Sequence, residues 1–254
     1  MGKKLKRVLS VLVVLGLAAF YMLGCENPFS DDDSDDNKKA VTEEVNYNPV
    51  IDPADFVTVI YNEYFPLVPG TKYTYSAVTD EGTERIEVYV THQTKEVLGV
   101  TCFVVDDKVW LDDELIEATL DWYAQDKDGN VWYMGEDSTE YEDGKAVSTE
   151  GSWEAGVDGA KPGIIMMVNP FVGVVYRQEY YKGEAEDKAE VLSLNESVTV
   201  PFGSYENCLR TKDWNPLDME TIEEKYYAPG IGMVQEVMVK GGNERVVLID
   251  ITTE

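Results

Sequence analysis

The chain has 254 residues and is strongly acidic, with 49 Asp and Glu against 21 Lys and Arg and a formal net charge of −28. Four of the basic residues and none of the acidic ones lie in the first 24 positions, so the rest of the chain carries −32. This charge excludes nucleic acid as a partner, because phosphate binding requires Lys and Arg. It also excludes docking on anionic lipid except through an anchor.

The N-terminus has the layout of a secretory signal. Four basic residues at 3–7 precede an apolar run at 8–23, and Gly24 then precedes Cys25; this order of charge, apolar core and small residue is typical of a signal peptide. The four residues Met-Leu-Gly-Cys that end at Cys25 resemble the lipobox of bacterial lipoproteins. The resemblance implies that Cys25 receives a diacylglycerol on its thiol and anchors the protein to a bacterial membrane. The alternatives are an ordinary signal peptide or an uncleaved anchor.

The sequence predicts three parts: a lipoprotein signal peptide at 1–24, a tether at 25–48 and a single β domain at 49–254. The tether contains the acidic run at 30–37, which cannot bury apolar surface and is therefore expected to be disordered. An acidic run close behind a lipidated cysteine resembles the surface-export tethers of some Gram-negative lipoproteins. We therefore expect a cell-envelope location, with the outer membrane or cell surface favoured, and a plain flexible spacer is the alternative.

The domain begins with a predicted short helix and continues as strands. Asp52 as N-cap with Pro53 at the first helical position favours a helical turn. From residue 71 onward apolar and polar residues alternate, which is typical of strands with one buried face. Asp128-Gly129 and Asp143-Gly144 are expected to form hairpin turns. We expect the segment 153–171 to be an irregular loop and a candidate binding element.

The strand pattern predicts an all-β fold. About twelve strands with short connections favour an antiparallel meander that forms one strongly curved sheet, an open or half barrel, because large twisted sheets curl or split. A two-layer sandwich is the alternative. A curved sheet has a concave apolar face, and the 28 aromatic residues could line it, although Tyr and Trp are also the usual cross-strand pairing residues of any sheet.

Two cysteines remain if Cys25 is lipidated. Cys102 and Cys208 lie in apolar strand contexts, and in an oxidising compartment such a pair can form a disulfide. The alternative is two buried thiols that behave as small hydrophobic side chains. The sequence leaves both states open, because it does not show whether the two Cβ atoms meet.

Calcium is the metal that the sequence best accommodates. Asp126, Asp128 and Asn130 alternate around a glycine, as at the start of calcium loops, and Glu136 follows as a fourth oxygen ligand. A simple hairpin turn is the favoured interpretation of this motif, because Asp-Gly is itself a hairpin dipeptide, and the calcium site is the alternative. The acidic residues at 106–107 and 112–114 are interpreted as solvated turns.

The sequence contains no catalytic motif. His92 is the single histidine; it shares the parity of Ile86, Val88 and Val90 and is expected to be a structural or exposed residue. Neither a Ser-His arrangement nor a zinc ligand set is present. The chain is therefore expected not to be an enzyme, with a hydrolase that uses paired carboxylates as the least favoured option.

Three stretches resemble a family of uncharacterised bacterial lipoproteins. They are Asn-Glu-Tyr-Phe-Pro-Leu-Val-Pro-Gly-Thr at 62–71, Asp-Lys-Asp-Gly-Asn-Val-Trp-Tyr at 126–133 and Tyr-Tyr-Ala-Pro-Gly-Ile-Gly at 226–232. The resemblance implies an exported, anchored β protein and no particular activity. The expected architecture is also similar to the half-barrels of lipoprotein-sorting carriers, which is an analogy of fold alone.

Together these features predict a membrane-anchored, non-enzymatic β module of the cell envelope. Its expected partners are the membrane, through the N-terminal lipid, and a small amphiphile or an envelope protein whose binding residues the sequence does not identify. A calcium-dependent structural or adhesive module is the alternative.

Overall fold

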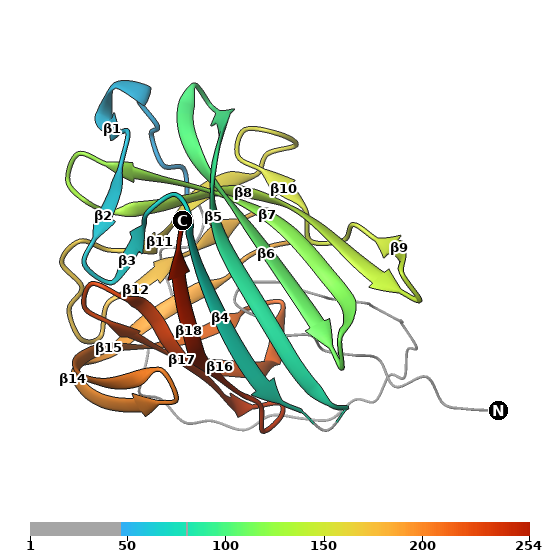
Figure 1. Cartoon of the computed structure of the whole chain (residues 1–254). Helices are drawn as coiled ribbons and strands as arrows, with labels where there is room; N and C mark the ends of the chain where they lie inside the picture. Colours follow the sequence, from blue (N-terminus) through green and yellow to red (C-terminus); the bar gives the residue numbers. More distant parts are fainter. Residues whose placement is uncertain (1–46, 80) are drawn as a thin grey trace, which may run out of the picture.

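The computed structural model describes residues 47–79 and 81–254 (Figure 1). The predicted signal peptide, Cys25 and nearly all of the predicted tether lie outside the described residues. Within the described part, no helix is long and apolar enough to cross a membrane.

The described chain is almost entirely strand. In chain order the elements are η1 (Pro53–Asp55), β1 (Phe56–Val57), β2 (Ile60–Asn62), β3 (Phe65–Leu67), β4 (Thr71–Val78), β5 (Thr83–Val97), β6 (Val100–Leu111), β7 (Glu114–Asp126), β8 (Val131–Glu142), β9 (Lys145–Ser148), β10 (Trp153–Glu154), β11 (Lys161–Met166), β12 (Val175–Arg177), β13 (Glu179–Tyr180), β14 (Lys188–Val200), β15 (Gly203–Asn215), β16 (Asp218–Ala228), β17 (Gly232–Lys240) and β18 (Arg245–Thr253).

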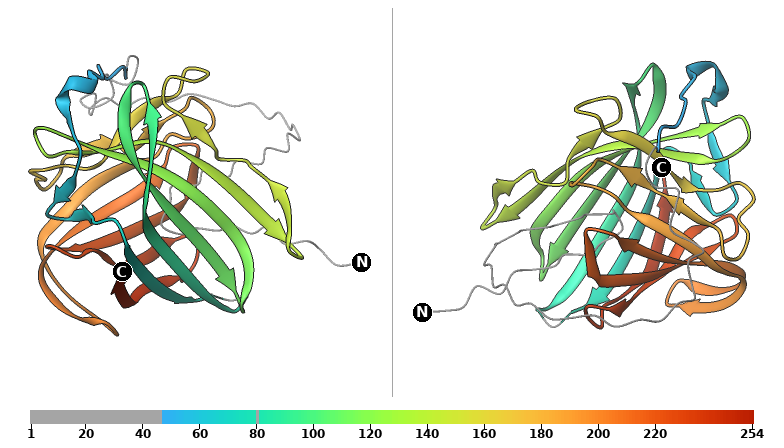
Figure 2. Two further views of the ribbon diagram at one scale, coloured as in Figure 1. Left: turned by 45° about the horizontal axis from the view of Figure 1, so that its top comes forward. Right: turned by 180° about the vertical axis from the view of Figure 1, so that it is seen from behind.

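Sixteen of these strands form one antiparallel sheet in the order β12-β14-β15-β16-β17-β18-β4-β5-β6-β7-β8-β11-β13, with β1, β9 and β10 paired at its side. The sheet curls into a nearly closed, barrel-like shape (Figures 1 and 2). Its two ends, β12 and β13, are separated in the chain by Gln178 alone, which places the seam there. The predicted all-β fold with one strongly curved sheet is confirmed, and the sandwich alternative is not observed.

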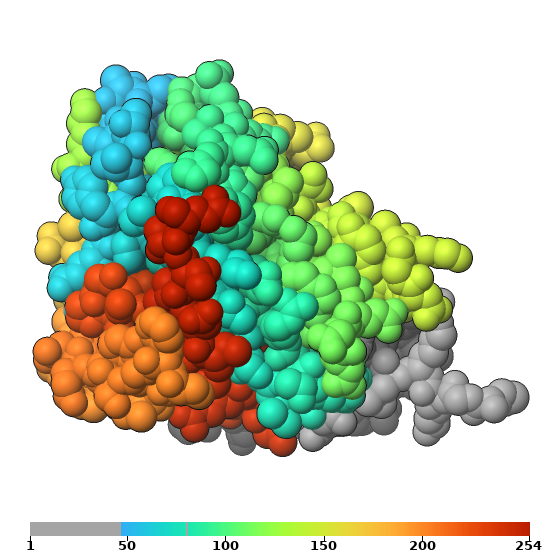
Figure 3. Space-filling model, in the orientation of Figure 1, coloured from blue at the N-terminus to red at the C-terminus, as the bar shows by residue number. Residues whose placement is uncertain are grey.

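The last strand completes the curved sheet. β18 pairs with β4 over the register from Val246↔Ala77 to Thr253↔Thr71. Figure 3 shows β18, in red, packed along the cyan strand β4, so the C-terminal strand lies beside the first long strand of the domain. The two halves of the meander are joined through this pairing.

The residues at two of the hairpin turns have the backbone conformation that a tight turn requires. Asp112 and Asp113 both have positive φ, as do Asp143 and Gly144, which is the conformation that a two-residue type I′ hairpin turn requires. The predicted helical turn is also present, as a 3-10 helix with Asp52 as N-cap. The strand number exceeds the predicted twelve because several short strands lack an alternating pattern of their own.

The segment 153–171 is not the irregular loop that the sequence predicts. β10 and β11 lie in it, and both pair with β8. Trp153 is buried and its ring packs edge-on against Tyr133 at 5.3 Å. The glycines and prolines of this segment therefore terminate short strands rather than prevent them.

A separate two-stranded hairpin, β2-β3, lies against the curved sheet. Gln125 of β7 accepts hydrogen bonds from the backbone N–H groups of Tyr61 and Asn62 at 2.8 and 2.9 Å. The Asn62 amide donates to the carbonyl of Gly129 at 2.9 Å. On the other side, the Gly230 N–H donates to the carbonyl of Glu63 at 2.7 Å. A few discrete contacts, rather than a strand ladder, hold this hairpin in place.

Asn62 is buried and provides most of the side-chain contacts of the hairpin. We expect Asn62→Ala to lower the free energy of unfolding by ~1–3 kcal/mol, because buried carbonyl and amide groups lose their partners. Amide hydrogen exchange should accelerate first in residues 60–67. The exposed Asn169→Ala is the control, and unchanged exchange in the hairpin would contradict the assigned role.

Candidate functional site

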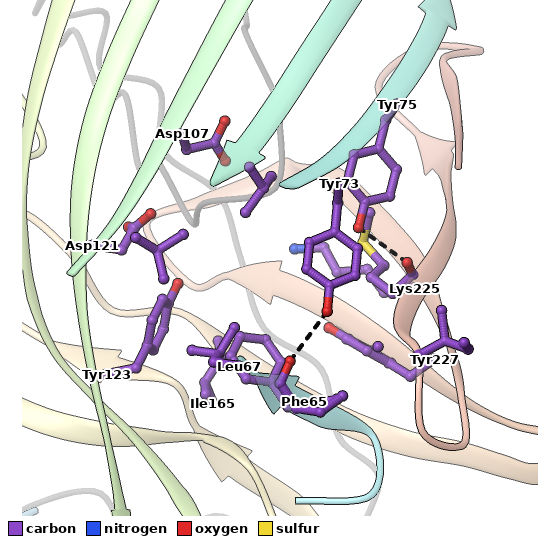
Figure 4. A pocket seen from close by; sticks show the side chains of 16 residues that line it. Phe65, Leu67, Tyr73, Tyr75, Asp107, Asp121, Tyr123, Ile165, Lys225 and Tyr227 are labelled. Carbon is purple, nitrogen blue, oxygen red and sulfur yellow. Dashed lines mark hydrogen bonds between the residues drawn. The ribbon is translucent and has the colours of Figure 1, made fainter. Parts of the chain in front are cut away.

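A cavity of about 60 Å³ lies inside the curved sheet, beneath the β2-β3 hairpin (Figure 4). Most of its wall is aromatic or aliphatic. The aromatic residues that line it are Phe65, Tyr73, Tyr75, Tyr123 and Tyr227, and the charged ones are Asp107, Asp121 and Lys225. The cavity thus combines an apolar wall with ionisable groups, the usual composition of a small-molecule site.

Strand alternation determines which side chains reach the cavity. On β4 the residues Tyr73 and Tyr75 are buried while their sequence neighbours face outward. Val88 of β5 pairs with Asp107 of β6, so both belong to the same inner face. Asp121 of β7 pairs with Val105, which lies two residues before Asp107 on β6 and faces the same side. Residues two apart on one strand point to the same side, and this places the carboxyl groups inside rather than in solvent.

The aromatic part of the wall is held in place by packing and hydrogen bonds. Tyr123 stacks on Tyr133 with ring centroids 4.9 Å apart, and Phe65 of the hairpin packs edge-on against Tyr123 at 5.2 Å. The hydroxyl of Tyr75 donates to the Met233 carbonyl at 3.1 Å. The rings are therefore positioned before any ligand arrives.

Behind this wall two carboxyl groups share a tyrosine. The Tyr133 hydroxyl lies 2.7 Å from Asp121 Oδ1 and 2.9 Å from Glu136 Oε2. Asp121 and Glu136 are also direct cross-strand partners. A hydroxyl donates one proton, so the second short contact requires a proton on one of the two carboxyl groups. Burial, and then the neighbouring carboxyl group, raises the pKa of Glu136 well above its ordinary value.

Lys225 is surrounded by acids on the opposite side of the interior. Its Nζ lies 3.6 Å from Asp213 and from Glu236, and 3.8 Å from Glu223. Burial lowers the pKa of Lys225, but the three carboxylates outweigh burial and raise the pKa well above its ordinary value. Lys225 is therefore charged, and its ammonium group is already paired with these three carboxylates.

Among the described acids that have a buried carboxyl oxygen without a hydrogen-bond partner, Asp107 is the one that lines the cavity. Its side chain is 4% exposed, lines the cavity, and has one carboxyl oxygen without a hydrogen-bond partner among the described residues. Burial raises its pKa well above the ordinary value, and Asp121 and Glu117 raise it further. Figure 4 shows Asp107 and Asp121 on one side of the cavity, with Lys225 and the tyrosines of β4 and β16 across from them.

The interpretation of 106–107 as a solvated turn is wrong, because both residues lie within β6 and Asp107 is buried. The signal that could have found Asp107 is its parity with Val105 and Val109, both of which are buried. Lys225 likewise shares the parity of the buried Tyr227. An ionisable residue that alternates in phase with the buried apolar residues of a strand therefore indicates a polar group in the interior. The sequence-based interpretation of 106–107 did not take this signal into account.

The candidate calcium residues Asp126, Asp128 and Asn130 lie at a hairpin turn, which is the interpretation that the sequence favoured. Asp126 accepts four hydrogen bonds at 2.8–2.9 Å: from the backbone N–H groups of Gly129 and Asn130, the Asn130 amide and the Trp132 indole. Asp128 is exposed, whereas Glu136 is in the buried contact with Tyr133.

No group of three or more His, Cys, Asp or Glu side chains in the described part of the chain is arranged to hold a metal ion. The carboxylate of Asp126 is already saturated by N–H donors, so this turn does not favour calcium. Calcium binding stays a prediction without a site among residues 47–79 and 81–254.

Both remaining cysteines are buried free thiols, which corrects the disulfide alternative. Cys102 lies on β6 and Cys208 on β15, and five strands separate them in the sheet. Burial raises the pKa of Cys102 to about 12 and that of Cys208 to about 11. Thiols with such pKa values are poor nucleophiles at neutral pH.

His92 is exposed, as expected. It does not continue the apolar face of Ile86 and Val90, because the register of β5 shifts between Val90 and Thr94. A β-bulge of this kind changes which side of the sheet the following residues occupy. His92 therefore lies away from the residues that line the cavity.

Comparison with known proteins gives two structural likenesses. A candidate exported protein with a YmcC-like fold from Bacteroides fragilis NCTC 9343 has a TM-score of 0.43 and 19% identity, covering 76% of this chain and 100% of its own. A candidate lipoprotein from Parabacteroides distasonis ATCC 8503 has a TM-score of 0.41 and 12% identity, covering 75% of this chain and 99% of its own. Likenesses at this level assign no activity. No protein-family model and no curated sequence matches the chain.

The buried acids make stability depend on pH. Burial raises the pKa of Glu117 from 4.5 to about 8, so over that range the folded protein holds a proton that the unfolded chain has released. The free energy of unfolding therefore falls as pH rises from about 4.5 to about 8. We expect Glu117→Gln to make the free energy of unfolding, measured by urea denaturation, fall less steeply with pH. The slope should decrease by up to ~1.4 kcal/mol per pH unit. The exposed Glu142→Gln should leave the slope unchanged, and an unaltered slope in both variants would contradict the prediction.

Asp126 is expected to act as a turn residue. Asp126→Ala should lower the free energy of unfolding by ~1–3 kcal/mol because two backbone N–H groups lose their acceptor. The loss should be equal with added calcium and with chelator, and Asp128→Ala should have little effect. A calcium-dependent rise in Tm that disappears in Asp126→Ala would refute this role and support a calcium site.

Proposed function

We propose that this protein is a lipid-anchored, non-enzymatic envelope protein that binds one end of a small amphiphile in the cavity beneath the β2-β3 hairpin. The observation that carries the proposal is the cavity itself, with its aromatic wall and a few ionisable groups inside a nearly closed sheet. An amphiphile fits this composition because it presents both an apolar and a polar part.

The sequence supports the envelope location. The charged, apolar and small-residue layout of 1–25 is typical of an exported protein, and the lipobox-like ending at Cys25 supports a lipid anchor. The strongly acidic remainder supports attachment to a membrane through that anchor and not through the protein surface.

The non-enzymatic character is supported by the residues at the cavity. No serine, cysteine or histidine of the described chain lines it. The two cysteine thiols have raised pKa values and His92 lies elsewhere. Binding, rather than bond cleavage, is the activity that these side chains support.

The β2-β3 hairpin provides a route of entry. Phe65 and Leu67 of β3 form part of the cavity wall. The hairpin is a sheet of its own and is attached to the large sheet by discrete hydrogen bonds. Its displacement opens the cavity without breaking the long ladders, and the apolar chain of the ligand then lies beneath the hairpin.

Titration with n-octanol tests the proposal. We expect saturable binding by isothermal titration calorimetry, and at least tenfold weaker binding in Val88→Phe, since the larger ring fills the cavity that Val88 lines. Val239→Phe on β17, where the valine is 50% exposed, is the matched control and should bind as the unaltered protein does. Absence of saturable binding, or equal binding in Val88→Phe, would reject the cavity as the site.

A further inference from the structure

The inner wall of the cavity carries an unpaired acid. Asp107 is 4% exposed, faces the cavity and has an oxygen without a hydrogen-bond partner among the described residues. Buried polar groups in native proteins are almost always hydrogen-bonded. Of the described acids with such an oxygen, Asp107 alone lines the cavity, so a ligand group that donates at this point would satisfy it.

The ionisable groups that face Asp107 are acids, namely Asp121 and Glu117 of β7 and Glu236 of β17. Asp106, which also raises the pKa of Asp107, lies on the opposite side of β6 and pairs with Lys108. Lys225 also lines the cavity, but three carboxylates on β15, β16 and β17 surround its ammonium within 3.8 Å. The local field therefore favours an incoming positive charge and opposes a negative one.

The aromatic wall favours the same sign of charge. Tyr73, Tyr75, Tyr123 and Tyr227 line the cavity with Asp107, and the faces of aromatic rings attract cations. A carboxylate or phosphate in this position would be repelled by each of the neighbouring acids that ionises. A neutral hydroxyl would form no ion pair with Asp107, whereas an ammonium would.

The free volume limits the size of the cationic group. The cavity measures about 60 Å³, whereas a single water needs roughly 10–15 Å³ of such space. A group of a few heavy atoms therefore fits with the hairpin closed, which suits a primary ammonium and its first methylene groups.

From this geometry we propose that the cavity selects a cationic amphiphile, a primary alkylammonium in chemical class, with Asp107 as the counter-ion of its ammonium group. The inference rests on the proposed function and specifies its ligand. The ammonium donates to the free oxygen of Asp107, while the alkyl chain extends along the aromatic wall towards the β2-β3 hairpin.

Ligand binding and proton release are then linked. Burial raises the pKa of Asp107, so the carboxyl group holds a proton when the cavity is empty. As the ammonium enters, that proton leaves to solvent and the carboxylate pairs with the cation. The affinity for an alkylammonium should therefore increase with pH, in the range where the amine itself remains protonated.

Three probes with the same chain test the proposal: n-octylammonium, n-octanol and octanoate, each titrated calorimetrically into the purified protein. We expect octylammonium to bind at least tenfold more tightly than octanol, and octanoate to bind most weakly. Comparable affinities for all three, or preference for octanoate, would overturn the cationic ligand and leave the proposed function intact. Absence of binding by every probe would reject both.

Two variants locate the selectivity. Asp107→Asn should abolish the preference for octylammonium over octanol when both probes are titrated into the same variant. Asp106→Asn is the matched control, because the neighbouring Asp106 pairs with Lys108 and does not line the cavity. Retained octylammonium selectivity in Asp107→Asn would overturn the assignment.

A second measurement does not depend on a folded variant. Octylammonium binding to the unaltered protein, measured in buffers of different ionisation enthalpy, should release a proton and strengthen by up to tenfold per pH unit below the pKa of Asp107. Binding that is independent of pH and releases no proton would contradict Asp107 as the counter-ion.

Discussion

The constraint on which this structure depends is the near closure of an alternating sheet around acidic residues. Each strand of a nearly closed sheet has one face that water hardly reaches, and this chain places carboxyl groups on that face of β6, β7, β8, β15 and β17. Among the described residues, Lys225 is the one basic side chain in the buried set. The interior therefore holds more acids than it can neutralise with its own cations.

Two arrangements near the cavity meet part of this excess. Around Lys225, three carboxylates share one ammonium. Around Tyr133, two carboxyl groups share a hydroxyl and a proton. Neither arrangement reaches Asp107, whose free oxygen faces the cavity. The same electrostatic excess thus links the stability of the fold, its dependence on pH and the preference that we propose for a positively charged ligand.

Local patterns predicted much of the fold. The alternation of buried Tyr73 and Tyr75 with outward neighbours, and the Asp-Gly turn at 143–144, are consequences of backbone geometry that neighbouring residues determine. The short strands β10 and β11 could not be predicted in this way, because their hydrogen-bond partners on β8 supply the order that their own sequence lacks. The calcium interpretation of Asp126 was open for the same reason: its saturating donors include the Trp132 indole.

The sequence by itself determined the class of fold, the strand alternation, the main turns and the net charge, because each depends on residue types or near neighbours. It also predicts the exported, lipid-anchored N-terminus, which lies outside the described residues. Only the tertiary structure decided that Cys102 and Cys208 are separate thiols, that Asp107 is buried and that a hairpin covers a cavity. These features arise from contacts between strands distant in sequence, whose register is fixed when the sheet curls and β18 pairs with β4.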